Sequence, residues 1–121
     1  MTREEIINMP AGYEMNNLIG QRVMGWHFDA DGNWEDGHGE YPDMRWWEYR
    51  FSPSTDIEAA WSVVEKLCNE NGCDVVKVCK RDPELLRGEW SCNFGLGFEA
   101  FGESASLAIC RAALLAVMDG E

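Results

Sequence analysis

Two stretches with the spacing of amphipathic helices constrain the fold of this chain more than any other feature. They are residues 54–67 (STDIEAAWSVVEKL) and 107–118 (LAICRAALLAVM). In each, apolar residues recur three and four positions apart, which places them on one side of a helix. The apolar side of each helix needs another apolar surface to pack against, and the rest of the chain has to supply that surface. The first stripe consists of Ile57, Ala60, Trp61, Val64, Leu67 and Cys68, and the second of Leu107, Cys110, Leu114, Val117 and Met118.

Cap signals delimit the helices. Thr2, followed three residues later by Glu5, is typical of a helix start, and a helix over residues 11–24 comes next. Ser54 or Thr55 is the predicted cap of the helix over residues 54–67, because a hydroxyl can accept a hydrogen bond from a free N–H group of the first turn. The last helix is predicted over residues 104–118.

Short runs with alternating or continuous apolar character, bounded by turn residues, predict strands. We expect them over residues 44–51, 74–79, 88–94 and 96–101. The resulting order of elements predicts an α+β fold with a single antiparallel or mixed sheet of about four strands. At 121 residues and 45% hydrophobic composition, the chain is expected to form one domain over residues 1–121.

The charge and the cysteines restrict the partners and the compartment. A formal net charge of −12 argues against a nucleic-acid polymer as partner, since such binding depends on many Lys and Arg contacts, but it permits docking on a basic protein. Five cysteines without a CxxC pair suit reduced thiols. There is no apolar run of about 18 residues and no signal-peptide pattern, so we expect a cytoplasmic protein without membrane contact.

The acidic segment over residues 27–43 is predicted to be a loop, and it resembles a calcium-binding loop only in part. Asp29, Asp31, Asn33 and Glu40 match EF-hand positions, but Trp34 stands where the sharp turn needs glycine. His27 and His38 lie eleven residues apart, which is not a recognised zinc spacing. We also find no nucleophile and base arrangement, and therefore predict no metal, no cofactor and no enzymatic activity.

Arg111 lies within or beside the apolar stripe of the last helix. A buried guanidinium needs an anion, and its planar fork suits either a carboxylate or a phosphate. A carboxylate such as that of Glu99 or Glu103 would make the arginine structural, whereas a phosphate would make it a ligand contact. Both interpretations remain open from the residues alone.

Six tryptophans are many for this length. We expect Trp61 in the core, while Trp26, Trp34, Trp46 and Trp90 lie at element ends, in loops or on faces that the alternation does not bury. Such aromatic faces can stack on a flat base or form a subunit interface. They therefore predict a ligand site that includes Trp26 and Trp90, and a homo-oligomer.

The two helical blocks, Met24-Gly25-Trp26 and the opening TREEIINMPAG resemble the phage ABA sandwich family of small phage and prophage proteins. That resemblance implies helices on both faces of the sheet. The chain also looks like phage anti-Thoeris sponges in its size, its C-terminal helix arginine and an asparagine on a preceding strand. This second resemblance implies Asn93 and Arg111 as ligand contacts, and the chemistry of nearby residues adds Trp90, Arg87 and Glu103.

Two functions follow. The sponge resemblance implies a phage counter-defence protein that sequesters a cyclic ADP-ribose isomer, or a cyclic oligonucleotide, without cleaving it. The alternative is an acidic phage protein that inhibits a host protein by direct binding, with its acidic surface and the segment over residues 29–43 on a basic site. A hydrolase of nucleotide signals has the least support, because it would need a metal or histidine site.

Overall fold

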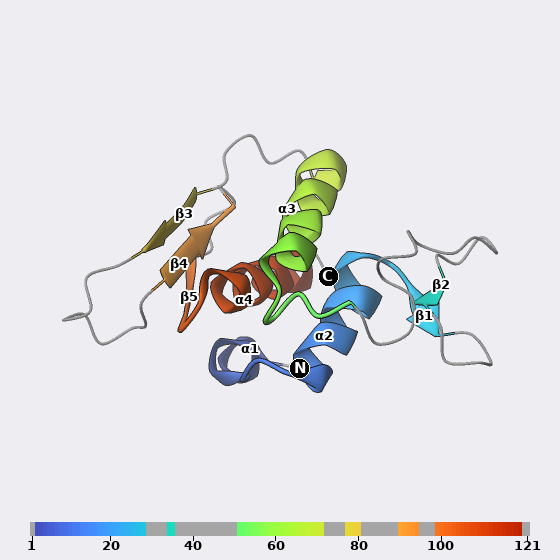
Figure 1. The fold of residues 1–121 in the computed structure, drawn as a ribbon, viewed down its shortest axis with the longest axis horizontal. Helices are drawn as coiled ribbons and strands as arrows, with labels where there is room; N and C mark the ends of the chain where they lie inside the picture. Colours follow the sequence, from blue (N-terminus) through green and yellow to red (C-terminus); the bar gives the residue numbers. More distant parts are fainter. Residues whose placement is uncertain are drawn as a thin grey trace.

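The computed structural model describes residues 2–28, 34–35, 51–71, 77–80, 90–94 and 99–119 (Figure 1). The helical elements are α1 (Arg3–Asn8), α2 (Tyr13–Leu18), the π-helical turn η1 (Ile19–Val23), α3 (Ile57–Asn71) and α4 (Ala105–Asp119). The strands are β1 (His27–Phe28), β2 (Trp34–Glu35), β3 (Lys77–Lys80), β4 (Trp90–Asn93) and β5 (Glu99–Gly102).

Strands β3, β4 and β5 form an antiparallel sheet in that order. The α+β class, the antiparallel sheet and the packing of helices on it are thus confirmed. Three of the four predicted strands have counterparts here, each within three residues of its predicted ends. The fourth, residues 44–51, lies outside the described residues except for the buried Phe51, which is in no strand.

The acidic segment over residues 27–43 was predicted as a loop, and the structure corrects its first part. β1 and β2 pair antiparallel, with His27 opposite Glu35 and Phe28 opposite Trp34. A pair of two-residue strands is short enough that alternation cannot reveal it in the sequence. Asp29, Asp31, Asn33, Glu40 and His38 lie outside the described residues.

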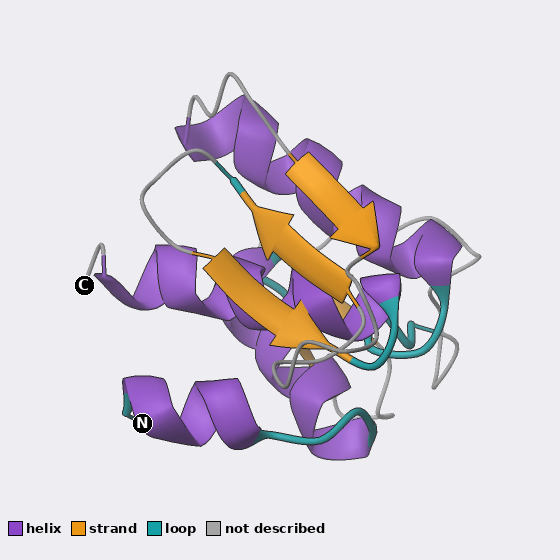
Figure 2. Ribbon diagram, turned by 90° about the vertical axis from the view of Figure 1, so that its left-hand side faces the viewer, coloured by secondary structure: helices purple, strands orange, loops and turns teal. Residues whose placement is uncertain are grey.

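Helix α4 is the centre of the molecule. One side packs on the sheet, mainly on β4 and β5, and the other sides contact α3, η1 and α1. In Figure 2 the sheet faces the viewer and the described helices lie behind it. Among the described residues, the layers are therefore the sheet, then α4, then the other helices.

The sequence of α4 explains this central position. A helix that is apolar on all sides is buried on all sides. The residues of α4 that are buried and cover its circumference are Leu107, Ala108, Ile109, Cys110, Ala112, Ala113, Leu114 and Leu115. At its start, Ser104 Oγ accepts a hydrogen bond from Leu107 N (3.1 Å), and a Cβ on Gly102 would lie 2.8 Å from Ala108 N. Strand β5 therefore approaches α4 too closely for any residue but glycine at that position.

The predicted helix over residues 11–24 is confirmed in position and consists of α2 followed by η1. Met24 N donates to Ile19 O (3.1 Å), and this spacing of five residues between donor and acceptor is that of a π-helical turn. Gly25 follows with a φ of +75°, a conformation that favours glycine and ends the helix. At the first helix, Glu5 N donates to Thr2 Oγ1 (3.2 Å), so the predicted cap is confirmed.

Helix α3 differs from its prediction in both cap and buried face. Asp56, rather than Ser54 or Thr55, caps it, because Asp56 Oδ1 accepts from Glu58 N (3.1 Å). Ile57 and Trp61 are 54% and 51% exposed, so their predicted place in the core is wrong. The residues that α3 does bury are Ala59, Ala60, Val63, Val64 and Leu67.

Candidate functional site

The guanidinium of Arg111 binds two main-chain carbonyls. Nε and Nη2 both donate to Met9 O, at 3.1 and 2.8 Å, and Nη1 donates to Phe101 O at 2.7 Å. Met9 directly follows α1, and Phe101 lies in β5. Arg111 therefore joins three elements, and at least three of its five N–H groups have partners in the protein.

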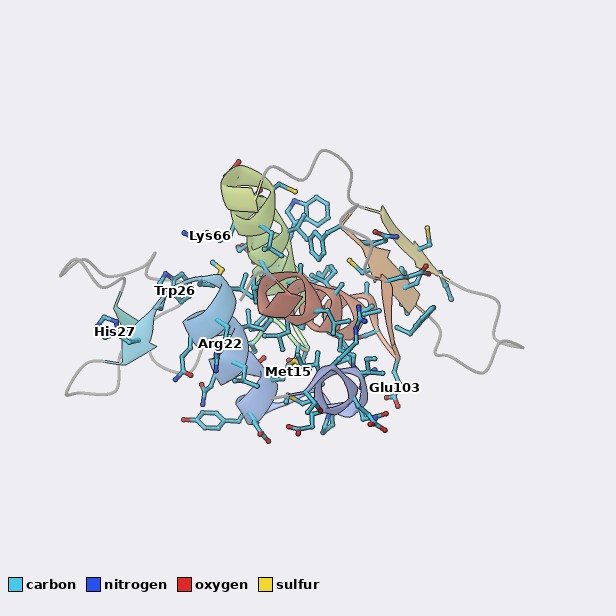
Figure 3. The ribbon with its side chains drawn as sticks, turned by 180° about the vertical axis from the view of Figure 1, so that it is seen from behind. Met15, Arg22, Trp26, His27, Lys66 and Glu103 are labelled. Atoms are coloured by element: carbon cyan, nitrogen blue, oxygen red, sulfur yellow. The ribbon has the colours of Figure 1, made fainter. Side chains whose placement is uncertain are left out.

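Burial and a nearby carboxylate act on Arg111 in opposite directions. Its partial burial lowers the pKa of the guanidinium, because burial disfavours the charged form, and the carboxylate of Glu103 opposes this shift. Arginine titrates so far above neutral pH that the group keeps its charge. Glu103 is exposed, and Figure 3 shows it beside α1. Arg111 and Glu103 are the two predicted site residues that the structure brings together.

Asn93 lies on the face of the sheet that is turned away from α4. It stands opposite Glu99 on β5 and Lys77 on β3. Its neighbour Cys92 is fully buried in the core beneath α4, and side chains alternate between the two faces of a strand. Asn93 is therefore directed away from α4, and the structure does not bring it to Arg111.

Trp90 and Trp26 are both half-buried and packed against the core, at different places. Trp90 shares its sheet face with Cys92 and stands opposite Gly102. Trp26 lies just after η1, where its ring meets that of Phe51 with centroids 4.9 Å apart. In Figure 3, Trp26 and Glu103 lie on opposite sides of the molecule. Arg87, the sixth predicted site residue, lies outside the described residues.

A different surface is marked by exposed apolar side chains. A shallow hollow on α3 is lined by Ile57, Glu58, Trp61, Ser62 and Glu65, which we call the α3 face. The spacing of these residues places them along one side of the helix. Both glutamates are exposed, and Ser62 Oγ donates to the main-chain carbonyl of Glu58 (3.3 Å).

Sequence reasoning missed the α3 face because it assigned its two apolar members to the core. The available signal was the pair of doublets Ala59-Ala60 and Val63-Val64, which predicts a second apolar stripe that overlaps the first. The small side chains of the first doublet let α3 come close to α4, and this stripe is the buried one. The large Trp61 is displaced to the surface.

The buried cysteines Cys92 and Cys110 offer no reactive thiol at neutral pH. Burial raises the pKa of Cys92 to about 12. It raises that of Cys110 as well, and the neighbouring Cys92 adds to this shift. A thiol needs to lose its proton to act as a nucleophile or metal ligand. Within the described ranges, no three His, Cys, Asp or Glu side chains are grouped as metal ligands would be.

Comparison with known protein families gives a match over most of the chain. The family model of the phage ABA sandwich domain matches residues 17–114, which include α3, the sheet and most of α4. No curated protein and no solved structure matches the chain. In the part of the chain that the structure describes, no helix is long and apolar enough to cross a membrane.

Proposed function

Because the chain belongs to the phage ABA sandwich domain family, we propose that it is a phage-encoded binding protein that acts on a host protein by direct contact, without catalysis. The contact takes place in the cytoplasm of the infected cell. The observation that carries this proposal is the α3 face, where a tryptophan and an isoleucine are each more than half exposed beside two glutamates.

The exposed pair supports a protein partner for energetic reasons. A large apolar side chain left in water forgoes about 1.5–3 kcal/mol of burial free energy, and tryptophan is among the side chains that contribute most to protein interfaces. Trp61 and Ile57 are four residues apart and therefore adjacent on the helix surface. Such an anchor, surrounded by polar residues, has the composition of an interface centre and its rim.

Sequestration of a nucleotide signal, such as a cyclic ADP-ribose isomer, is the second candidate. It is favoured by Arg111, which is half-buried beside the exposed Glu103 and has two N–H groups outside the three bonds described above. A ligand held there would have to share the guanidinium with Met9 and Phe101. Asn93, on the other face of the sheet, would have to come from a neighbouring subunit.

Site-specific crosslinking tests the first candidate. A photoreactive amino acid at Ile57 is expected to give a discrete adduct with one host protein in cells, whereas the same amino acid at Tyr13, which is 60% exposed on α2, is not. Equal adduct patterns at both positions, or no adduct at Ile57, would contradict the proposal. Calorimetric titration with cyclic ADP-ribose isomers and cyclic oligonucleotides tests the second candidate in parallel.

A further inference from the structure

The geometry of the α3 face points to the chemistry of its partner: we infer that it binds a basic amphipathic segment, with a Lys or Arg side chain of the partner over Trp61 and between Glu58 and Glu65. This inference rests on the proposed function, because it describes the partner of the same surface. It goes further in naming the charge and shape that this partner presents.

The spacing on α3 creates a site for a cation. Glu58 precedes Trp61 by three residues and Glu65 follows it by four, so the two carboxylates flank the indole one turn away on each side. A cation over the face of a tryptophan is attracted by the ring, and carboxylates on both sides add to this attraction. Ile57, beside Trp61, offers an apolar contact to a neighbouring side chain of the same segment.

In the part of the chain that the structure describes, the hollow lies on one helix, and this favours an extended occupant over a small ligand. Within the described ranges, its lining residues lie between positions 57 and 65 of α3, and no second described element supplies an opposite wall. A small ligand needs a concave site that buries most of its surface. A segment of another protein can instead lie along the helix and cover Ile57 and Trp61 together.

The negative charge of the α3 face favours a basic partner over a second copy of the chain or a nucleic acid. A second copy of the chain, placed with its α3 face on this one, would bring the glutamates of both copies together, and like charges at close distance repel. A nucleic acid would bring its phosphates to the same carboxylates. A basic segment is complementary both to the α3 face and to a protein with a formal net charge of −12.

The test uses a defined probe, a fluorescein-labelled 14-residue helical peptide of leucine and lysine, with a leucine and glutamate peptide as its counterpart. Anisotropy is expected to show binding of the lysine peptide only. Trp61→Ala should weaken it about tenfold, and Glu65→Gln about threefold to fivefold, with the second effect lost at high salt. Melting curves establish that each variant is folded.

A matched control separates the α3 face from general attraction by the acidic protein. Glu14→Gln removes the same charge from an exposed position on α2 and should change affinity less than twofold. Equal losses for Glu14→Gln and Glu65→Gln, unchanged affinity in Trp61→Ala, or equal binding of the acidic peptide would each overturn the inference. If Ile57 still gives a host adduct in that case, the proposed function stands; absence of the adduct overturns the proposed function itself.

Discussion

Arg111 donates two hydrogen bonds to the main-chain carbonyl of Met9, a residue 102 positions earlier in the chain. This carbonyl belongs to the residue that caps the end of α1. The last carbonyls of a helix have no partner within it, so a cation at this position stabilises the helix end. With its third bond to Phe101, Arg111 fastens both the N-terminal helix and strand β5 to α4.

Replacement of Arg111 therefore tests a structural role. Arg111→Ala leaves two carbonyls without these donors and should lower the free energy of unfolding by about 2–4 kcal/mol. Arg111→Lys should recover part of this loss, because an ammonium group keeps the charge but cannot reproduce the planar fork. Urea denaturation of the three proteins provides the measurement. An Arg111→Ala variant as stable as the parent would contradict the structural role.

The buried Ser54 allows a comparison between two serines. Its Oγ donates to Asn16 Oδ1 (2.7 Å) and accepts from Gly12 N (3.0 Å), so it ties the segment before α3 to the start of α2. Ser54→Ala removes both bonds in the interior and should cost about 1–3 kcal/mol of stability. Ser62→Ala, on the α3 face, removes one bond to its own helix and should cost less than about 0.5 kcal/mol. Similar losses in the two variants would disprove this assignment.

The buried thiols predict a loss of stability in alkaline solution. The unfolded chain releases the proton of Cys92 near its ordinary pKa of 9.0, whereas burial raises the pKa of the folded-state thiol to about 12. Its contribution is therefore complete below pH 9 and is lost as the pH rises toward 12, at about 1.4 kcal/mol per pH unit. Denaturation at pH 8 to 11 should show a shallower decline for Cys92→Ala than for the parent. Parallel declines would refute this source of pH dependence.

The secondary structure could be predicted because helices and strands have different apolar periods. The orientation of α3 could not, since Ala59-Ala60 and Val63-Val64 make a stripe that competes with the one through Ile57 and Trp61. Which of the two stripes is buried depends on how closely α4 approaches α3, and only the folded chain determines that distance.

The partners of Arg111 and the orientation of Asn93 could not be predicted from the sequence either. That reasoning gave Arg111 an anionic partner, a carboxylate or a phosphate, because it considered side chains and ligands. The partners found are main-chain carbonyls, one of them supplied by a residue remote in sequence. Alternation shows that Asn93 and Cys92 lie on opposite faces of β4, but it does not show which face α4 covers.

The oligomeric state remains a prediction from the number of aromatic residues. We expect light scattering at micromolar concentration to give a mass above the 13.7 kDa of one chain. Because the α3 face is assigned to a basic partner rather than to a second copy, Trp61→Ala should have the same mass as the parent. A monomeric parent would contradict the first expectation, and a monomeric Trp61→Ala protein derived from an oligomeric parent would contradict the second.

One measurement tests the central claim most directly. It is the yield of the host-protein adduct from the photoreactive amino acid at Ile57, in a protein that also carries Trp61→Ala. Trp61 is half exposed, so its replacement should change the free energy of unfolding by less than about 1 kcal/mol, whereas Val63→Ala, at a fully buried position, should cost about 2 kcal/mol. We predict that the host adduct disappears in the folded Trp61→Ala protein and persists in a matched Tyr13→Ala protein. An undiminished adduct in Trp61→Ala would contradict the claim that this protein acts through its α3 face.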